Sequence, residues 1–473
     1  MPVEWSGSGP ALLVTLDREG GRGLREQLED QLRAAIRDGR LGAGEKVPSS
    51  RELARALRLS RGLVQDCYAQ LQAEGYLTSH PGSATRVATD VVPPTGEQAP
   101  RPTLSPRTRF PVADFRSGVP DLRLAPRADW AWAIAEVCRT LPDAAFDYGD
   151  PVGERGPREV IAAYLSRVRA VAATADHVLV CAGMAQATTL VLRTLADEGV
   201  STLAFEDPGA GVSTTEVAEA AGLAAVPVRV DADGIDVPAL RRTATRAVLV
   251  TPAHQWPTGV VLSGPRRQEL IAWARERDAV ILEDDYDAEF RYDRDPVGSL
   301  QGLAPDRVIS MGTVSKSMAP VLRLGWLVAP DRMLPMLARH KRLLDRGSPG
   351  LDQHALATLI ESGRYDRHLR RARTEYATRR ETLIAALDRH APGVPVTGLA
   401  AGFHAVLHLP RGAGEDRVIA AAAERGVGLY GMASMRHGTG GTEPRLVIGF
   451  GDTTRHAIEE GIATIADLLT PKR

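Results

Sequence analysis

Cysteine and net charge are both scarce in this sequence. Its 473 residues include three cysteines, Cys67, Cys138 and Cys181, and none lies close enough to another to form a metal-binding or redox motif. Each lies in an apolar run, so we expect all three to be buried and unreactive. The 58 lysines and arginines balance 59 aspartates and glutamates, so a surface that binds a polyanion must be local.

Long hydrophobic runs are also missing. No stretch approaches about eighteen apolar residues, the length that spans a membrane. The N-terminal sequence MPVEWSGSGPALLV has no basic region followed by a long apolar core. We therefore expect a cytoplasmic protein without a membrane span or a secretion signal. Its length predicts more than one domain.

One change in composition divides the chain. Residues 91–110, VVPPTGEQAPRPTLSPRTRF, contain five prolines and almost no hydrophobic periodicity, which predicts an extended linker. The linker separates a short region, residues 18–90, from a long one, residues 111–473.

The short region is predicted to form three helices and a hairpin. LREQLEDQLRAAIRDG has leucine and isoleucine at helical spacing. Ser49 and Glu52 have the spacing of a capping box, and Ser60 is a second N-cap candidate. Residues 75–88 are typical of two short strands joined around Gly82. Three helices followed by a hairpin predict a winged helix-turn-helix, an α+β fold.

Positive charge is concentrated in the turn and second helix of this region. Residues 46–61 contain five basic side chains and one acid, whereas residues 18–90 contain twelve basic and ten acidic ones. Basic side chains and helix N-termini bind DNA phosphates, and the first residues of a recognition helix contact base edges. A solvated face of a small helical domain would show the same charge. The predicted DNA-binding residues are Lys46, Arg51, Arg55, Ser60, Arg61, Gln65 and Gly82.

The motifs of this region resemble the DNA-binding domain of GntR-type bacterial regulators. The resemblance is carried by PSSRELARALRLSRGLVQDCYAQLQAEGYL followed by GSATRV, and it covers nearly all of residues 20–88. It implies promoter DNA as a partner. Gly62 and Leu63 replace a polar residue and a threonine that are usual in the family, so the base preference stays open.

Beyond the linker, short β-rich runs alternate with helical segments. The runs are continuous in valine, isoleucine and leucine, as in a sheet buried on both faces. They are HVLVCAG, TLAFED, AAVPVRV, RAVLVTP, AVILEDD, RVISMGT and LRLGWLVA. The pattern predicts an α/β domain with a mixed, mostly parallel sheet and with ligands at the loops after its strands.

Two consecutive strand ends carry an unusual set of polar residues: Asp284, Tyr286, Thr313, Ser315, Lys316 and Arg323. Taken singly, Lys316 could lie in a capped loop, and the acidic residues could be an exposed strand end or a divalent-cation site. Together they match the needs of a pyridine-type electron sink. Such a group requires a lysine for a Schiff base, a carboxylate at its ring nitrogen, a phenol near its 3-hydroxyl, and hydroxyls with arginine for its phosphate.

The order of these motifs resembles fold-type I aminotransferases, and more closely the MocR-type subfamily of GntR regulators. In that subfamily an aminotransferase-like domain follows a winged helix. The resemblance runs from about residue 111 to the C-terminus and includes YGDPVGERGPREVIAAYL, CAGMAQA, TPAHQWPTGV and PRLVIGFG. It implies pyridoxal 5′-phosphate as the cofactor, with Lys316 forming the Schiff base, Asp284 at the ring nitrogen and Tyr286 at the 3-oxygen.

The resemblance also implies roles for residues outside the two strand ends. The further cofactor contacts are Gly183, Met184, Ala185, Trp256 and, across a subunit boundary, Tyr148, and the effector carboxylate falls to Arg445. Two motifs depart from the family. Ala210 replaces the tyrosine that stacks on the ring, and Met184 and Ala185 stand where serine or alanine and glutamine are usual. Trp256 fits the aromatic position of the MocR-type motif, where ordinary aminotransferases usually carry an asparagine. From the residues alone, Tyr148 could be a core tyrosine, Arg445 a surface ion-pair partner, and His254 a structural histidine.

The leading hypothesis is a DNA-binding transcription regulator that senses an amine, an amino acid or the vitamer itself through Lys316. The resemblance implies a head-to-tail, domain-swapped homodimer. One alternative is an active aminotransferase with an auxiliary DNA-binding module. Another is a DNA-binding protein whose large domain has lost its cofactor and serves for dimerisation or for sensing the free vitamer. Ala210 and Trp256 favour a sensor over an efficient enzyme.

Overall fold

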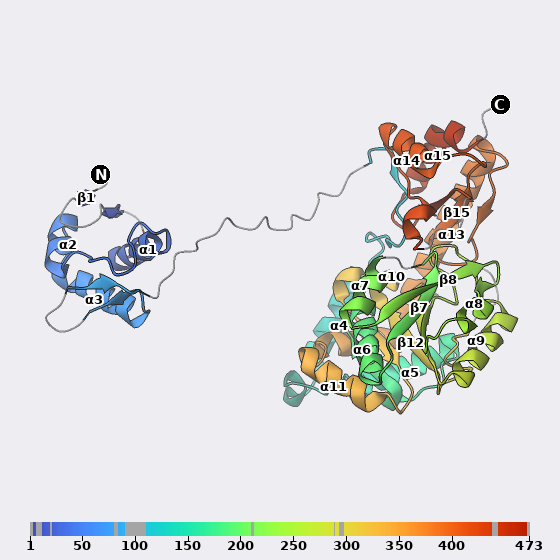
Figure 1. Ribbon diagram of the computed structural model, residues 1–473, viewed down its shortest axis with the longest axis horizontal. Coiled ribbons are helices and arrows are strands. Elements are labelled where there is room, and N and C mark those ends of the chain that lie inside the picture. The colour runs from blue at the N-terminus through green and yellow to red at the C-terminus, as the bar shows by residue number, and fades with distance from the viewer. Residues whose placement is uncertain are drawn as a thin grey trace. The chain divides into compact units, whose positions relative to one another are not determined.

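The winged helix and the α/β domain expected from the sequence are both present in the computed structural model. It describes residues 3–5, 12–18, 21–79, 84–89, 110–209, 212–287, 289–292, 298–437 and 443–470. The chain divides into two units, residues 1–107 and 108–473, and Figure 1 shows the elements of each. Each unit has a hydrophobic core of its own.

The N-terminal unit is a winged helix-turn-helix. Its elements are β1 (Val3–Trp5), β2 (Leu12–Val14), α1 (Leu24–Arg37), α2 (Ser50–Leu57), α3 (Arg61–Ala73), β3 (Leu77–Thr78) and β4 (Arg86–Val87). The capping box of Ser49 and Glu52 begins α2, and Ser60 caps α3, as predicted. β3 and β4 pair antiparallel, which confirms the hairpin. Its predicted tip, Gly82, lies outside the described residues.

Apolar faces of the three helices form the core of this unit. Leu28 and Leu32 of α1 pack with Val64 and Leu71 of α3, and all four side chains are buried. Val14 of β2 belongs to the same core, so residues before 18 contribute to it.

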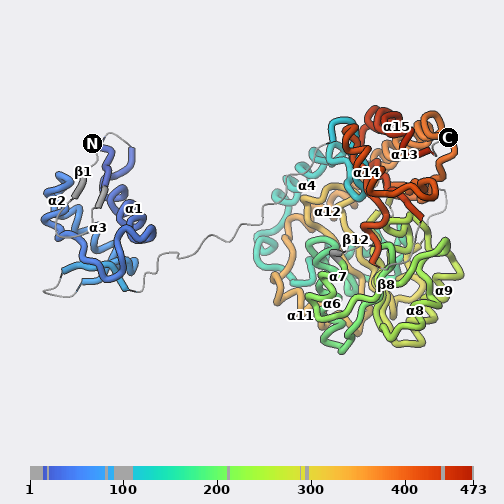
Figure 2. Tube along the Cα trace, turned by 45° about the horizontal axis from the view of Figure 1, so that its top comes forward, coloured from blue at the N-terminus to red at the C-terminus, as the bar shows by residue number. Residues whose placement is uncertain are grey.

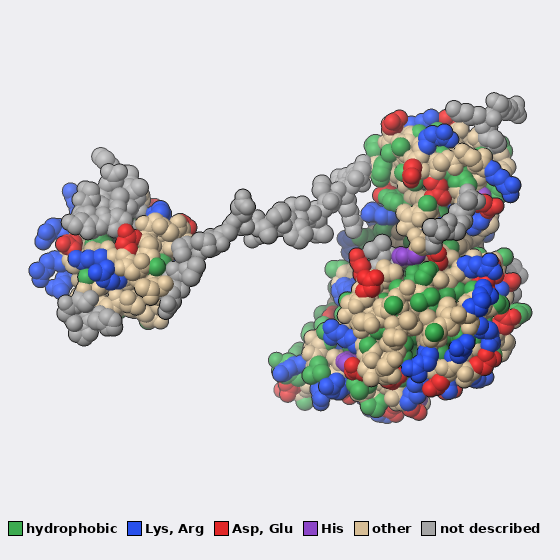
Figure 3. Space-filling view, in the orientation of Figure 1, with side chains coloured by type: hydrophobic (Ala, Val, Ile, Leu, Met, Phe, Trp, Pro, Cys, Tyr) green, Lys and Arg blue, Asp and Glu red, His purple; other side chains and the backbone are tan. Residues whose placement is uncertain are grey.

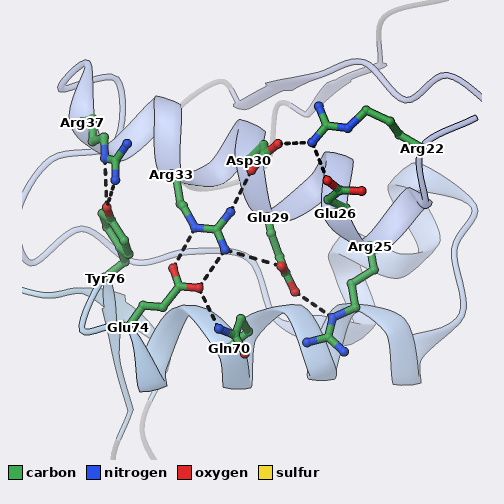
Figure 4. A network of polar contacts seen from close by, with 10 residues as sticks. All are labelled: Arg22, Arg25, Glu26, Glu29, Asp30, Arg33, Arg37, Gln70, Glu74 and Tyr76. Atoms are coloured by element: carbon green, nitrogen blue, oxygen red, sulfur yellow. Dashed lines mark hydrogen bonds and ion pairs between the residues drawn. The ribbon is translucent and has the colours of Figure 1, made fainter. Parts of the chain in front are cut away.

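A network of ion pairs joins α1 to the end of α3 (Figure 4). Arg33 donates hydrogen bonds to both carboxylate oxygens of Glu74, each at 2.7 Å. These bonds lower the pKa of Glu74 to about 2. The remaining ion pairs of the network join Arg22 to Glu26 and Asp30, Arg25 to Glu29, and Arg33 to Glu29 and Asp30. The acidic side chains of α1 are thus neutralised within the unit.

The main sheet of the large unit is mixed and mostly parallel, as predicted. Its strands are β6 (Val178–Cys181), β7 (Thr202–Asp207), β8 (Ala224–Asp231), β9 (Gly234–Ile235), β10 (Ala247–Val250), β11 (Val280–Asp285), β12 (Val308–Thr313) and β13 (Gly325–Val328). Their spatial order is β6-β13-β12-β11-β10-β7-β8-β9. The five strands from β12 to β8 are parallel, whereas β13 is antiparallel to both of its neighbours and β9 to β8.

Helices cover both faces of this sheet, and alternate residues of a strand enter opposite cores. Val280 and Leu282 face one core, and Ile281 faces the other. The first face is covered by α6 (Met184–Asp197), α7 (Val212–Ala220) and α11 (Leu334–Asp345). The second is covered by α4 (Arg127–Thr140), α5 (Arg155–Arg169), α8 (Val237–Arg241), α9 (Gly264–Glu276) and α12 (Gly350–Glu361). This two-sided burial explains why the strands are continuously apolar.

A smaller lobe follows the main sheet in the chain, and Figures 1 and 2 show its helices gathered together. It contains an antiparallel sheet, β14-β15-β17. A short strand near the linker, β5, pairs with β16. The elements are β5 (Ala113–Asp114), α13 (Arg364–His390), β14 (Val396–Thr397), β15 (His404–His408), α14 (Glu415–Glu424), β16 (Val427–Gly428), β17 (Arg445–Gly449) and α15 (Arg455–Leu469).

Two further expectations concern the burial of the cysteines and the presence of membrane-spanning helices. Cys67 and Cys181 are buried, but Cys138 is exposed, so the prediction for Cys138 is wrong. Its apolar run is α4, and Cys138 lies on the solvent side of that helix. Among the described residues, no helix combines the length and the apolar character needed to cross a membrane.

We predict that Glu74→Gln loosens the junction between α1 and α3. The folded-state pKa of Glu74 lies below its ordinary value, so its ion pair stabilises the fold above that ordinary value and is lost as the pH falls toward about 2. Hydrogen–deuterium exchange of α1 and α3 peptides in the full chain, corrected for intrinsic rates, should be faster in the variant at pH 7. The difference should shrink at pH 3. Equal exchange at pH 7 would show that the pair contributes nothing.

Candidate functional site

The carboxyl ends of β6, β11 and β12 meet at one edge of the main sheet. Thr313, the last residue of β12, lies opposite Gly325, and Gly325 lies opposite Cys181 at the end of β6. On the other side of β12, Asp284 of β11 lies opposite Met311. The loops that follow these strands are therefore neighbours, at the edge where α/β sheets bind ligands.

Lys316 lies in α10 (Val314–Ser317), a single helical turn directly after β12. The Thr313 side chain caps this turn by accepting a hydrogen bond from the backbone N–H of Ser315. The half-buried Lys316 amine donates to the carbonyl of Gly118 at 2.5 Å. Burial lowers the pKa of Lys316, while the charges of Asp284 and Asp287 oppose that shift. The loop is therefore capped, and it positions an amine whose pKa lies below that of a free lysine.

Asp284 is the one carboxylate of its cluster with an oxygen that lacks a hydrogen-bond partner among the described residues. Its Oδ1 is enclosed and unpaired. The neighbouring acids are occupied: Asp285 pairs with Arg169 at 2.7 Å, and Glu283 accepts from Ser299. Burial, followed by the charges of Asp285 and Asp287, raises the pKa of Asp284 to about 7. Glu283 and Asp285 are each bound to a different partner, so the three consecutive acids are not arranged as ligands of one shared cation. This arrangement leaves one carboxylate for a hydrogen-bond donor such as a ring nitrogen.

Tyr286 is held by a group of buried polar side chains. Its hydroxyl donates to the backbone carbonyl of His254 at 3.1 Å. The His254 ring nitrogen Nδ1 lies 2.8 Å from Asp287 Oδ2, and the ring packs against His404 with centroids 4.5 Å apart. His254, Asp287 and His404 are ligand types that zinc accepts. Because His254 and Asp287 are hydrogen-bonded to each other, we assign them to the support of Tyr286.

The predicted phosphate contacts come together at the start of α6. Gly183 has a φ of 86° and directly precedes Met184 and Ala185, the first residues of that helix. Arg323 donates to the carbonyl of Ala182 at 2.6 Å. A Cβ at Gly183 would lie 3.4 Å from the Arg323 guanidinium, so a side chain there would crowd the turn. A helix N-terminus beside an exposed arginine forms an anion-binding cradle.

The two hydroxyl groups near Lys316, on Thr313 and Ser315, differ in burial and in their hydrogen bonds. Thr313 is buried, and its Oγ1 interacts with the Leu324 carbonyl and the Ser315 hydroxyl, each at 2.9 Å. Ser315 is half-buried. A phosphate contact from this loop therefore depends more on Ser315 than on Thr313.

Trp256 brings an aromatic surface to Lys316. A Cβ at Gly118 would lie 3.9 Å from the Trp256 ring and 4.0 Å from Lys316 Nζ, so both side chains border this glycine. The indole also packs edge-to-face on His404. Ala210, the position at which the family has a stacking tyrosine, lies outside the described residues.

Two predicted residues are not part of this cluster within one chain. Tyr148 is 83% exposed, and its described neighbour is Arg346, which lies over its ring at 6.0 Å. Tyr148 is therefore not a core tyrosine. Arg445 lies opposite His408, four residues along β15 from His404, or about 14 Å at the usual rise. Its guanidinium pairs with Glu443 at 2.9 Å, the ion pair that the sequence left open as an alternative.

The predicted DNA-binding residues of the N-terminal unit all have exposed side chains, apart from Gly82, which is not described. They are Lys46, Arg51, Arg55, Ser60, Arg61 and Gln65. Within the described residues of this unit, no ion pair involves Lys46, Arg51, Arg55 or Arg61, in contrast to the paired arginines of α1. Figure 3 shows basic side chains gathered on the α2 side of the unit. Positive charge is thus available at the N-terminal ends of α2 and α3.

Comparison with known proteins agrees with both units. The family described as bacterial regulatory proteins of the gntR family matches residues 24–87, and that described as aminotransferase class I and II matches residues 113–451. The chain belongs to the MocR-type subfamily of GntR regulators. It is thus a helix-turn-helix transcription regulator with a fold-type I aminotransferase domain.

Individual relatives cover nearly the whole of this MocR-type chain. An uncharacterized HTH-type transcriptional regulator of Bacillus subtilis, YhdI, is 33% identical over 96% of this chain and 98% of its own. The pyridoxine biosynthesis regulator PdxR of Corynebacterium glutamicum is 31% identical over 97% and 99%. The probable rhizopine catabolism regulator MocR of Rhizobium meliloti is 33% identical over 87% of each chain.

Among solved structures, an archaeal alanine:glyoxylate aminotransferase superposes with a TM-score of 0.69. It is 26% identical, and the match covers 76% of this chain and 90% of that one. LysN, an α-aminoadipate aminotransferase of Thermus thermophilus, superposes with a TM-score of 0.66 at 26% identity, covering 76% and 92%.

The aminotransferase domain implies pyridoxal 5′-phosphate, and the described residues of this MocR-type protein fit that cofactor. The unpaired Oδ1 of Asp284 suits a ring nitrogen, the Lys316 amine suits an aldehyde, and the turn at Gly183 with Arg323 suits a phosphate. When bound, the cofactor supplies an aldehyde that condenses with primary amines and a ring that accepts electrons. The protein's part is to hold the ring, to keep Lys316 available and to exclude competing partners from Asp284.

Sequence reasoning did not identify several supporting residues. Asp287 and His404 both contact His254, whose carbonyl accepts a hydrogen bond from Tyr286. Asp287 directly follows Tyr286 in the chain, but nothing in the sequence relates His404 to it. Glu206 accepts hydrogen bonds from Thr251 and Gln255 behind Trp256, and burial raises its pKa to about 7. An acid at the end of an apolar strand, TLAFED, was the available signal for Glu206.

We predict that Asp284→Asn stabilises the cofactor-free protein more at pH 8 than at pH 5. The raised pKa of Asp284 means that the folded chain binds a proton between about pH 4 and 7 that the unfolded chain has released, so stability falls as the pH rises. Asparagine removes this cost. Thermal unfolding at the two pH values measures it, and an equal effect at both would contradict the prediction.

The adjacent residue provides the control. Asp285→Asn removes the partner of buried Arg169 and should lower the unfolding temperature at both pH values.

Proposed function

We propose that this regulator detects a primary amine, an amino acid or a pyridoxal vitamer at Lys316 and converts its binding into a change in promoter affinity. One observation carries the proposal. The Lys316 amine and the Asp284 carboxylate, whose Oδ1 has no partner among the described residues, lie at adjoining strand ends of a chain that also contains a basic winged helix. The name of the relative PdxR, a pyridoxine biosynthesis regulator, supports the vitamer as one signal.

Each residue of the site has a separate part in this process. Burial keeps a fraction of Lys316 neutral and therefore nucleophilic toward the cofactor's aldehyde. Asp284 would hold the ring by accepting a hydrogen bond at its nitrogen, and Tyr286 would lie at the 3-oxygen. An incoming amine would compete with Lys316 for the cofactor and so free the lysine side chain. That release alters contacts inside the large unit, which is the local event an allosteric coupling requires.

In this proposal the effector carboxylate falls to Arg445, although the described contacts of one chain do not bring this residue to the Lys316 cluster. Its Nε is enclosed without a hydrogen-bond partner among the described residues, while Nη2 is taken by exposed Glu443. A bidentate carboxylate would have to displace Glu443, and arginine binds carboxylates best in that geometry.

A homodimer completes the proposal. Tyr148 projects into solvent with Phe146 nearby in the chain, and Val321 is 81% exposed next to the phosphate-binding Arg323. Exposed apolar groups bordering a site are typical of a surface that a partner covers. We propose that a second copy, arranged head-to-tail with swapped domains, covers it and places its own Tyr148 at this cofactor's phosphate.

The sensor and the enzyme differ in turnover. With pyridoxal 5′-phosphate, the wild type should gain a visible absorption band that Lys316→Ala lacks, because the band requires the lysine amine. Adding an effector amine should change the band and the affinity for promoter DNA without sustained release of a keto acid. Sustained keto-acid release would favour an aminotransferase, and the absence of any band in the wild type would favour a domain that has lost its cofactor.

DNA binding by the N-terminal unit is tested with two arginines in opposite settings. Arg51 is exposed and unpaired among the described residues, whereas Arg22 is held by Glu26 and Asp30. Arg51→Ala should weaken promoter binding and reduce the slope of log affinity against log salt by about one. Arg22→Ala should leave both nearly unchanged. Identical behaviour of the two variants would overturn the assignment of the DNA-binding surface.

A further inference from the structure

Lys341 of α11 is a fully buried lysine outside the Lys316 cluster. A lysine ammonium has three N–H donors, and here all three are used. They reach Asp345 at 2.6 Å, Ser348 at 2.9 Å and the side-chain oxygen of Gln186 at 3.0 Å. Burying a charged group so completely is costly unless it is paired and hydrogen-bonded, so these bonds define its place.

Through Gln186, this network reaches the phosphate-binding turn. The same Gln186 oxygen accepts a hydrogen bond from the backbone N–H of Ala182 at 2.7 Å, and its amide donates to Asp345 at 2.6 Å. The carbonyl of Ala182 accepts from Arg323. The backbone N–H and the carbonyl of Ala182, just before Gly183, are therefore both hydrogen-bonded, the first to Gln186 and the second to Arg323.

Through Ser348, the network also reaches the segment that follows Tyr148. The Ser348 carbonyl accepts from Gln353 at 2.9 Å, and the buried Gln353 accepts from the backbone N–H of Glu154, also at 2.9 Å. Val180, just before the turn, donates to the carbonyl of Val152 at 2.8 Å. One set of buried polar groups thus connects the phosphate-binding turn with residues 152–154.

We propose that Lys341 is a positioning residue that sets the backbone geometry of the phosphate-binding turn at Gly183 by holding Gln186 against Ala182. The inference rests on the proposed site for pyridoxal 5′-phosphate. Lys341 does not contact the cofactor itself. It fixes the amide groups at the start of α6 in the orientation that accepts a phosphate, and it supplies a buried positive charge near the turn.

The charge of Asp345 agrees with this role. Burial alone would raise the pKa of Asp345, but hydrogen bonds from Lys341 and Gln186 outweigh burial and hold it below its ordinary value. The carboxylate therefore stays ionised and keeps both Lys341 and Gln186 in place. Because Lys341 and Asp345 lie one helical turn apart on α11, the helix itself sets their separation.

The test compares two ligands that differ only in the phosphate. Lys341→Met removes the ammonium and keeps an unbranched side chain of similar volume. The variant should bind pyridoxal 5′-phosphate roughly tenfold more weakly than the wild type, by analogy with the loss of outer residues that orient metal ligands. Its affinity for pyridoxal should be unchanged, because pyridoxal uses Lys316 and Asp284 but not the turn. Absorbance titrations of the full-length protein measure both affinities.

A neighbouring basic residue is the matched control. Arg342→Met makes a similar change one position along α11, at an exposed side chain, and should leave both affinities unchanged. Gln186→Met is the second variant, and it decides the question if Lys341→Met does not fold. It removes the bond to Ala182 while leaving Lys341 paired with Asp345, and it should show the same loss specific to the phosphate ligand.

The outcomes separate this inference from the proposed function. A loss confined to pyridoxal 5′-phosphate supports the positioning role. Equal losses for pyridoxal and its phosphate would show general damage to the domain and overturn it, as would unchanged affinity for both ligands. If the wild type itself binds neither ligand, the proposed cofactor site fails, and this inference fails with it.

Discussion

Asp284 lies near the end of β11 and Lys316 directly follows the neighbouring parallel strand β12, at a depth where burial disfavours the charge of both groups. Burial raises the pKa of the carboxyl and lowers that of the amine, so the protein alone does not satisfy either group fully. A ligand that offers a ring N–H to one and a carbonyl carbon to the other relieves both costs together. Much of the large unit can be understood as the framework that keeps this pair in place and otherwise unpartnered.

That framework acts mainly by giving the neighbouring carboxylates hydrogen-bond partners of their own. Arg169 pairs with Asp285, and Ser299 donates to Glu283, so Asp284 alone among the three consecutive acids keeps a free oxygen. Thr313 caps α10, the helical turn that carries Lys316. Buried acids without such partners would repel one another and take up protons, and the selectivity of the site for one donor would be lost.

Charge is partitioned in a comparable way in the DNA-binding unit. The arginines and acids of α1 neutralise one another, so that helix adds little to the external field. The basic residues at the start of α2 and α3 remain unpaired within the described part of this unit. In this nearly neutral protein, the winged helix presents these unpaired basic side chains at the N-terminal ends of two helices (Figure 3). Under the proposed function, release of Lys316 is the event that would change the affinity of this surface for promoter DNA.

The sequence by itself determined the local structure and the inventory of the site. Continuous valine, isoleucine and leucine runs located the strands of the main sheet from β6 to β13, apart from the two-residue β9. Burial on both faces favours such runs in the inner strands, whereas the residues of β8 are mostly exposed or half-buried. Ser49 and Ser60 located two helix starts, because a capping side chain bonds within three residues. Lys316 and its companions could be grouped because successive parallel strands end at one edge.

Tertiary structure alone decided which distant side chains meet. His404 packs against Trp256, 148 residues earlier in the chain, and no spacing in the sequence predicts that contact. Cys138 is exposed because the rotation of α4 about its axis is set by packing, not by the apolar character of the run. Lys341 reads as an ordinary surface lysine until the fold brings Gln186 beside it, 155 residues earlier in the chain. Hydrogen bonds and ion pairs act over a few ångströms, so such contacts exist only after the helices and strands have packed.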